Sequence, residues 1–169
     1  MRSSEATTES NPAARATPVH EFVGRRIAET HRVAQAALDL RMRALGADFT
    51  TWKVLAHLVH GGLPSQRELA ARMLIDPATL VRHLDRVEAE GLVVRERDER
   101  DRRILRVVIT PEGRERHTEL HRVVEQFDRE LRAQLEPSQC QALFAALRRI
   151  TEYVSTDLTK ERADGARVS

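Results

Sequence analysis

Apolar residues recur with a helical period at both ends of the chain. From residue 19 to residue 45 they fall every three or four positions, the spacing of a helix with one buried face, and Gly46 ends the pattern. The period resumes after Pro111, is broken at Pro137, and continues in a last helix that we expect to end at Lys160. The chain is therefore predicted to begin and end in long amphipathic helices.

Between these outer helices, local signals predict three shorter ones. Asp48, Ser65 and Asp76 each precede an apolar period, and their side chains can accept hydrogen bonds from the first free N–H groups of a helix. Glu68 follows Ser65 by three residues and completes a capping box. Pro77 follows Asp76 at the first helical position, where the missing N–H of proline costs nothing.

The helix that begins at Pro77 and stops at Gly91 has one apolar face, formed by Leu80, Leu84 and Val87. Its outward face holds Ala78, Thr79, Arg82, His83 and Arg86. Small or hydrogen-bonding residues near the start of a helix, with arginine one turn on, suit the reading of base edges in a DNA major groove. An ordinary solvated amphipathic helix has the same pattern, so this motif alone does not distinguish the two.

After Gly91 the period changes to two. Residues 92–97 and 104–109 are predicted to form the strands of a hairpin, with the charged residues 98–103 at its tip. An arginine that projects there suits a narrow minor groove, where negative potential is concentrated, and the neighbouring Asp101 can hold Arg103 extended. The alternative is a charged turn that protects the edges of the sheet.

The order of these elements predicts a mainly α fold with a small β-hairpin wing, that is, a winged helix-turn-helix. The outer helices carry more apolar surface than so small a core can cover, so we expect them to pack against a second copy. The predicted regions are a disordered leader (1–18), a helical dimerisation region (19–46 and 111–160), a winged lobe (48–110) and a frayed tail (161–169).

Composition narrows the class of protein. A chain of 169 residues with 41% hydrophobic and 32% charged residues fits one globular domain, and its net charge of +2 does not by itself indicate a nucleic-acid partner. No apolar run is long enough for a membrane span and no secretory leader is visible, so we expect a cytoplasmic protein without a membrane partner. Aromatic residues are only 4%, which argues against a base-stacking platform for single strands.

An enzyme is not expected. A hydrolase or transferase would need a nucleophile with a base, a set of metal ligands or a glycine-rich phosphate loop. The seven glycines form neither a dinucleotide-binding fingerprint nor a phosphate loop. A single cysteine excludes an internal disulfide and a four-thiolate zinc site. We expect no cofactor and no bound metal.

The central part of the chain resembles a known family. The run FTTWKVLAHLVHGGLPSQRELAARMLIDPATLVRHLDRVEAEGLVVRERDERDRRILRVVITPEGRE, residues 49–115, resembles the core of the multiple antibiotic resistance regulator (MarR) family of homodimeric winged-helix transcription factors. Its most specific parts are ELA at 68–70, DPATLVRHLDRVEAEGLV, and the wing ending DRRILRVVITPEG. Together, in this order and at this spacing, they make a strong match.

The resemblance implies a homodimer that binds double-stranded DNA. We expect its site to be an inverted repeat, and repression rather than activation if that site overlaps a promoter. Residues 76–90 correspond to the recognition helix, and Arg103 of the wing corresponds to the arginine that enters the minor groove. The residues that we assign to DNA contact are Ser65, Gln66, Ala78, Thr79, Arg82, His83, Arg86, Arg97, Asp101, Arg102 and Arg103.

The resemblance also implies a small-molecule effector, often phenolic or anionic, in a cleft between the dimerisation region and the lobe. The residues expected to line this cleft are Arg25, His31, Arg41, Trp52 and His57. Trp52 also fits a plain core position, given its place in the apolar stripe of its helix. Nothing in the sequence identifies the ligand.

Three alternatives stay open. A redox-responsive regulator would need a reactive cysteine near the start of the first long helix, whereas Cys140 lies on the last one and is better interpreted as a bystander thiol. A zinc-responsive regulator could use His117 and His121, one turn apart, or His57 and His60, but solvated helical histidines are the simpler interpretation. The third alternative is a helical interaction module without DNA binding.

Overall fold

The computed structural model describes residues 22–165, and the side chains of residues 22–157. It is mostly helical with one two-stranded hairpin, which confirms the predicted fold class. In chain order the elements are α1 (Val23–Arg43), α2 (Phe49–Gly61), α3 (Gln66–Met73), α4 (Pro77–Ala89), β1 (Val93–Arg97), β2 (Leu105–Ile109), α5 (Pro111–Arg132) and α6 (Pro137–Gly165). The predicted leader (1–18) and residues 166–169 lie outside the described residues.

The predicted helix starts are confirmed by their hydrogen bonds. The side chains of Asp48 and Asp76 each accept from a backbone N–H one turn on, and Ser65 and Glu68 form the reciprocal capping box. Thr110 caps α5 in the same way. The end of α6 differs from the expectation, because the helix continues beyond residue 160 to residue 165. Residues 160–164 contain no glycine or proline to stop it.

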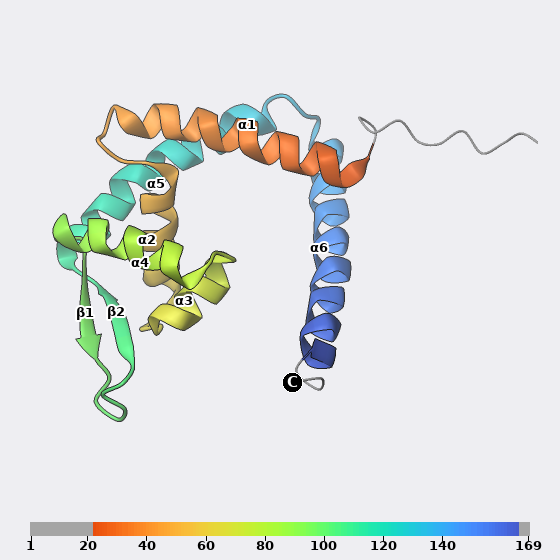
Figure 1. Ribbon diagram of the computed structural model, residues 1–169. Helices are drawn as coiled ribbons and strands as arrows, with labels where there is room; N and C mark the ends of the chain where they lie inside the picture. The colour runs from red at the N-terminus through yellow and green to blue at the C-terminus, as the bar shows by residue number, and fades with distance from the viewer. Residues whose placement is uncertain (1–21, 166–169) are drawn as a thin grey trace, which may run out of the picture.

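Helices α2, α3 and α4 pack with the hairpin around one apolar core (Figure 1). Leu80, Leu84 and Val87 of α4 are completely buried in it, as their spacing predicted. The strands pair antiparallel, with Val93 opposite Ile109, so both apolar ends of the hairpin are anchored in this core. The charged end of the hairpin consequently projects from the lobe.

A second core joins α1, α2 and α5, and is centred on Leu38, Met42, Leu120 and Phe127. In Figure 1, α1 and α5 run along one side of the lobe, while α6 extends away from the rest of the chain. Several large apolar side chains of α6 are exposed, namely Leu143, Phe144, Leu147, Tyr153 and Val154. None of the described helices combines the length and apolarity that crossing a bilayer requires.

Candidate nucleic-acid interface

The polar face of α4 remains open on the surface of the lobe. Ala78 and Arg82 are exposed, and Thr79 and His83 are half-buried. Arg82 Nη2 donates to the hydroxyl of Thr79 at 3.1 Å, so the predicted base-reading pair is in contact. This bond is on the surface, and Arg82 can exchange it for another acceptor with little loss.

The wing is held in shape by Asp98 rather than by Asp101. One carboxylate oxygen of Asp98 accepts from the backbone N–H groups of Arg100 (2.9 Å) and Asp101 (3.0 Å). The other accepts from Arg106 Nε at 2.7 Å. The hydrogen bond from Arg106, followed by those from the backbone, lowers the pKa of Asp98 to about 2. The carboxylate is therefore ionised across the physiological range and keeps the turn closed.

Arg106 also connects the wing to the neighbouring helix α3. Its Nη1 donates to the Glu68 carboxylate and to the Leu63 backbone carbonyl, both at 3.2 Å. Arg97 stays within the hairpin as well and donates to the backbone carbonyl of Arg102 at 2.9 Å. Arg97, which the sequence assigned to DNA, thus has a partner inside the chain.

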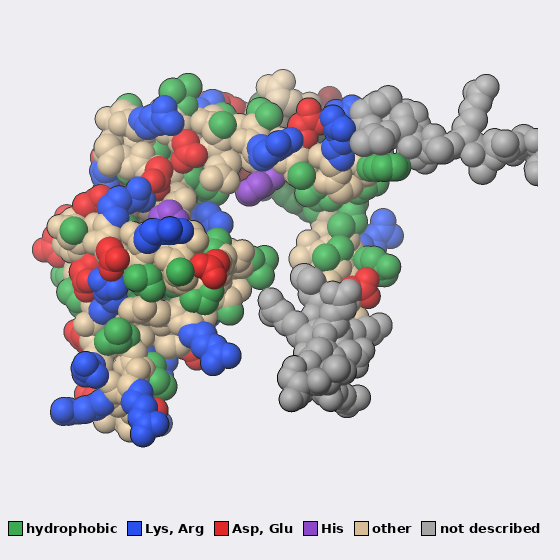
Figure 2. Space-filling model, in the orientation of Figure 1, with side chains coloured by type: hydrophobic (Ala, Val, Ile, Leu, Met, Phe, Trp, Pro, Cys, Tyr) green, Lys and Arg blue, Asp and Glu red, His purple; other side chains and the backbone are tan. Residues whose placement is uncertain are grey.

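Arg102 and Arg103 stand at the exposed tip. Among the described residues, neither guanidinium has a hydrogen bond or an ion pair. Asp101 accepts from the backbone N–H of Arg103 at 3.0 Å, not from its guanidinium as the sequence suggested. Figure 2 shows Lys and Arg side chains gathered at the projecting end of the hairpin. The Arg100 guanidinium likewise has no partner among the described residues, so Arg100, Arg102 and Arg103 are the free cations of the wing tip.

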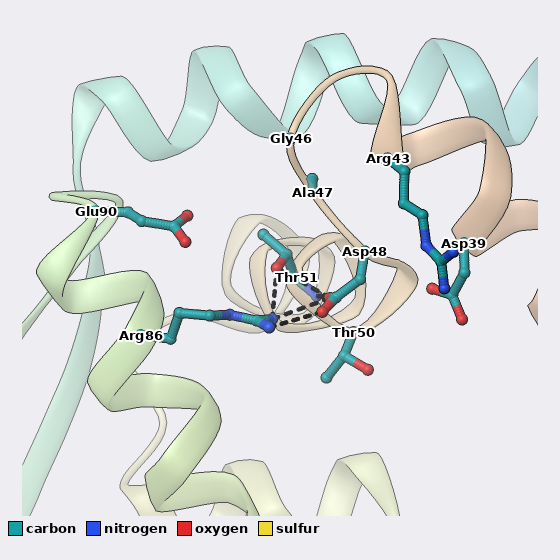
Figure 3. A pocket seen from close by; sticks show the side chains of 9 residues that line it. All are labelled: Asp39, Arg43, Gly46, Ala47, Asp48, Thr50, Thr51, Arg86 and Glu90. Carbon is teal, nitrogen blue, oxygen red and sulfur yellow. Dashed lines mark hydrogen bonds and ion pairs between the residues drawn. The ribbon is translucent and has the colours of Figure 1, made fainter.

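Arg86 has partners within the chain too, at the pocket drawn in Figure 3. Its guanidinium contacts both carboxylate oxygens of Asp48, at 2.7 and 3.0 Å, and the Thr51 hydroxyl at 2.9 Å. Partial burial alone would raise the pKa of Asp48, but the hydrogen bonds from Arg86 and Thr51 outweigh it and the pKa is lowered. Sequence reasoning missed this pair because its members are 38 positions apart.

Ser65 and Gln66 lie at the start of α3. Ser65 accepts from the Glu68 N–H at 3.2 Å and is occupied as the helix cap. Gln66 is half-buried, and its Nε2 has no hydrogen-bond partner among the described residues. Neither residue is presented to solvent as openly as the wing tip.

Three of the five predicted ligand residues meet at one pocket of about 530 Å³. Its lining is His31, Phe49, Trp52, Lys53, Ala56, His57, His60, Gly61 and Arg72. Arg25 and Arg41 are not part of it. Arg41 instead pairs with Glu130 at 2.6 Å and lies over the Phe127 ring, 4.7 Å from its centre.

The pocket combines an aromatic wall with positive charge. Phe49 and Trp52 stack with their ring centres 5.3 Å apart, and Trp52 Nε1 is buried without a partner among the described residues. Burial lowers the pKa of His57, and the nearby Lys53 and Arg72 lower it further. The pocket therefore suits a flat molecule that carries negative charge.

Next to this pocket, imidazole rings form a column between α2 and α5. Trp52 stacks on His121 (6.1 Å between ring centres), His121 on His117 (5.3 Å), and His60 meets His117 edge-on (6.1 Å). Burial lowers the pKa of His117, and His121 and His60 add to this effect. Across the described residues, no three His, Cys, Asp or Glu side chains are grouped so that they could hold a metal.

Cys140 lies at the first turns of α6, half-buried, with Arg132 Nη1 3.9 Å from its sulfur. Cys140 thus belongs to α6 and not to α1, and its interpretation as a bystander thiol stays a prediction.

Two short helices, a projecting hairpin and outer helices define a winged helix-turn-helix protein. Residues 45–104 match the sequence model of the MarR family. The chain is 32% identical over 103 residues to the HTH-type transcriptional regulator YdgJ of Bacillus subtilis strain 168, in a match that covers 61% of this chain and 63% of that relative. The chain belongs to the MarR family.

Solved structures also resemble this chain over most of its length. Transcriptional regulator PA3341 is 31% identical, with a TM-score of 0.72, over 80% of this chain and 99% of that one. The reduced form of MarR from E. coli is 25% identical, with a TM-score of 0.69, over 76% of this chain and 96% of that one. YdgJ and PA3341 are both named as transcriptional regulators.

Proposed function

We propose that this protein is a homodimeric transcriptional regulator that binds double-stranded DNA. The observation that carries the proposal is the group of unpartnered arginines at the tip of the wing, Arg100, Arg102 and Arg103; Arg97 and Arg106, by contrast, are bonded within the chain. An arginine without an internal partner loses no bond when it enters a minor groove, where it gains a strong negative potential. Family membership agrees with this proposal.

In this proposal α4 enters the major groove. Thr79 and Arg82 supply base discrimination, worth about 1–3 kcal/mol for a good bidentate contact. Phosphate contacts supply most of the affinity, which therefore falls steeply as salt rises.

The dimer is proposed to form through the outer helices. Apolar side chains of α6, such as Leu143 and Leu147, are exposed in the single chain, and burying them against a second copy removes this surface from water. Two α4 helices related by a two-fold axis would then meet an inverted repeat whose halves are about 34 Å apart, one turn of DNA.

The pocket beside Trp52 is proposed to take the effector. Its aromatic wall and its cations, Lys53 and Arg72, favour a phenolic or other aromatic anion. Such a ligand releases DNA only by binding more tightly to a dimer whose α4 helices no longer fit successive grooves. We propose a repressor that its ligand releases from DNA.

The test begins with selection of binding sites from random double-stranded DNA by the purified full chain. The affinity for the selected site is then measured across a salt series. Arg103→Ala should weaken binding and lower the salt slope by about one per protomer. The matched control is Arg122→Ala, which removes the same charge from an exposed position on α5 and should leave both unchanged.

The outcomes separate the candidate functions. Enrichment of a two-fold symmetric site supports the proposed regulator, and an unchanged slope in Arg103→Ala would remove the wing from the interface. Arg82→Ala should instead flatten the preference among variant sites. If no sequence is enriched, the chain acts as an interaction module without DNA binding.

A further inference from the structure

The recognition helix α4 is tied to its surroundings by arginine–carboxylate links on two sides. Toward the wing, Arg95 of β1 donates to Glu88 through Nε (2.8 Å) and to Asp85 through Nη2 (2.7 Å). Toward α2, Arg86 contacts both carboxylate oxygens of Asp48. Fixed links on both sides restrict the rotation of α4 about its own axis. This rotation decides which side chains of α4 reach the bases.

The link at Asp48 joins α4 to the outer helices. Asp48 caps α2, where its Oδ1 accepts from the Thr51 N–H at 2.7 Å. At the next residue, the Phe49 N–H donates to Asp39 of α1, also at 2.7 Å. Helix α1 is thus linked to Arg86 through the first turn of α2, by the Phe49–Asp39 hydrogen bond, the peptide link between Phe49 and Asp48, and the contacts of Asp48 with Arg86. Figure 3 shows the last of these contacts.

The outer edge of the Arg86 guanidinium is engaged in this arrangement. Its Nη1 and Nη2 make three contacts with Asp48 and Thr51, and the bidentate geometry orients the guanidinium plane. To present this bidentate edge to a phosphate, Arg86 would have to leave Asp48 as a partly buried carboxylate without its ion pair. This cost opposes the simple expectation that Arg86 is a phosphate contact.

We propose that Arg86 is a positioning residue, which holds α4 at a fixed angle to α2 through Asp48 and Thr51 and raises DNA affinity without touching DNA. This inference rests on the proposed function. It assigns to Arg86 and Asp48 a role in the spacing of the two α4 helices of the dimer, because the same link reaches the α1 helix that we place in the dimerisation region.

Asp48→Asn is the decisive variant. Asparagine keeps the capping oxygen of α2 but loses the ion pair to Arg86. Removal of a negative charge near DNA would by electrostatics alone tighten binding, whereas loss of the positioning link weakens it. The two explanations therefore predict opposite signs.

The experiment measures affinity for the selected site across a salt series for the wild type, Asp48→Asn, Arg86→Ala and the double variant. We expect each single variant to lose about fivefold or more in affinity with an unchanged salt slope, and the double variant to lose no more than either. The matched control is Glu90→Gln, which removes a carboxylate charge from the same pocket but breaks no contact with the described residues. It should bind as tightly as the wild type or more tightly, but should not lose affinity.

A lower salt slope in Arg86→Ala, together with unchanged or tighter binding by Asp48→Asn, would make Arg86 a phosphate contact and overturn the inference. Additive losses in the double variant would overturn it as well. Urea unfolding of each variant shows whether a loss of affinity comes from an unfolded fraction. The affinity and its salt slope are then calculated from the concentration of folded protein. If the wild type itself selects no DNA, the proposed function fails and this inference fails with it; if only Asp48→Asn behaves as the wild type, this inference alone fails.

Discussion

Gly113 lies where the first turn of α5 meets the end of the wing, and replacing it with alanine should destabilise the fold. An added Cβ would lie 2.0 Å from the Leu92 carbonyl oxygen and 2.9 Å from Ile109 Cγ1. Carbon–oxygen contacts this short do not occur, so the Leu92 carbonyl would have to move by about 1 Å. That carbonyl accepts from the Thr110 N–H at 3.1 Å, a bond which holds the turn before α5.

The cost can be worked from these contacts. Overpacking of this kind costs about 1–3 kcal/mol, and weakening the hydrogen bond from Thr110 adds about 1 kcal/mol. Alanine recovers up to about 1 kcal/mol through its better helix propensity. We therefore expect Gly113→Ala to lower the free energy of unfolding by about 1–3 kcal/mol.

Urea unfolding followed by circular dichroism, at one protein concentration for all variants, measures this change. The control is Gly24→Ala, because a Cβ at Gly24 meets nothing within 4 Å in helix α1. It should leave stability unchanged or raise it slightly. A Gly113→Ala protein as stable as the wild type would refute the packing argument.

Three further predictions concern pH, backbone strain and the pocket. Burial lowers the pKa of His57 and His117, so below pH 6.5 the unfolded chain binds more protons than the folded one. The free energy of unfolding should therefore be full above pH 6.5 and fall as the pH drops below it. Urea unfolding of His117→Gln should show a weaker dependence of this free energy on pH. Leu74 is 87% exposed and has a φ of 54°, a backbone conformation that is strained for leucine but not for glycine. Leu74→Gly should therefore raise the free energy of unfolding, measured in urea, by about 0.5–1 kcal/mol. A decrease would contradict the interpretation that Leu74 is strained. Binding of 4-hydroxybenzoate in the proposed effector pocket should change the fluorescence of Trp52, the one tryptophan of the chain. Lys53→Ala should weaken this binding. If the ligand leaves the fluorescence of both proteins unchanged, phenolic acids are excluded.

Local patterns in the sequence were enough to predict the fold and part of the candidate nucleic-acid interface. The caps at Asp48, Ser65 and Asp76 each act over one helical turn, and their sequence signatures predicted where the helices begin. The apolar spacing of α4 likewise indicated its buried face, and therefore its open one. The alternation before and after the charged tip predicted the wing.

The partners of individual charged groups were decided only by the tertiary structure. Arg86 and Arg97 looked as available to DNA as Arg103 did, because all lie on polar faces or at the hairpin, yet folding pairs the first two with groups of this chain. Only three of the five expected ligand residues meet at one pocket, since the crossing of α1 over α2 and α5 sets which helix faces converge. Capping and amphipathic periodicity depend on neighbours three or four positions away and can be read along the chain. An ion pair or a pocket joins residues dozens of positions apart, and its members are chosen by how the helices pack.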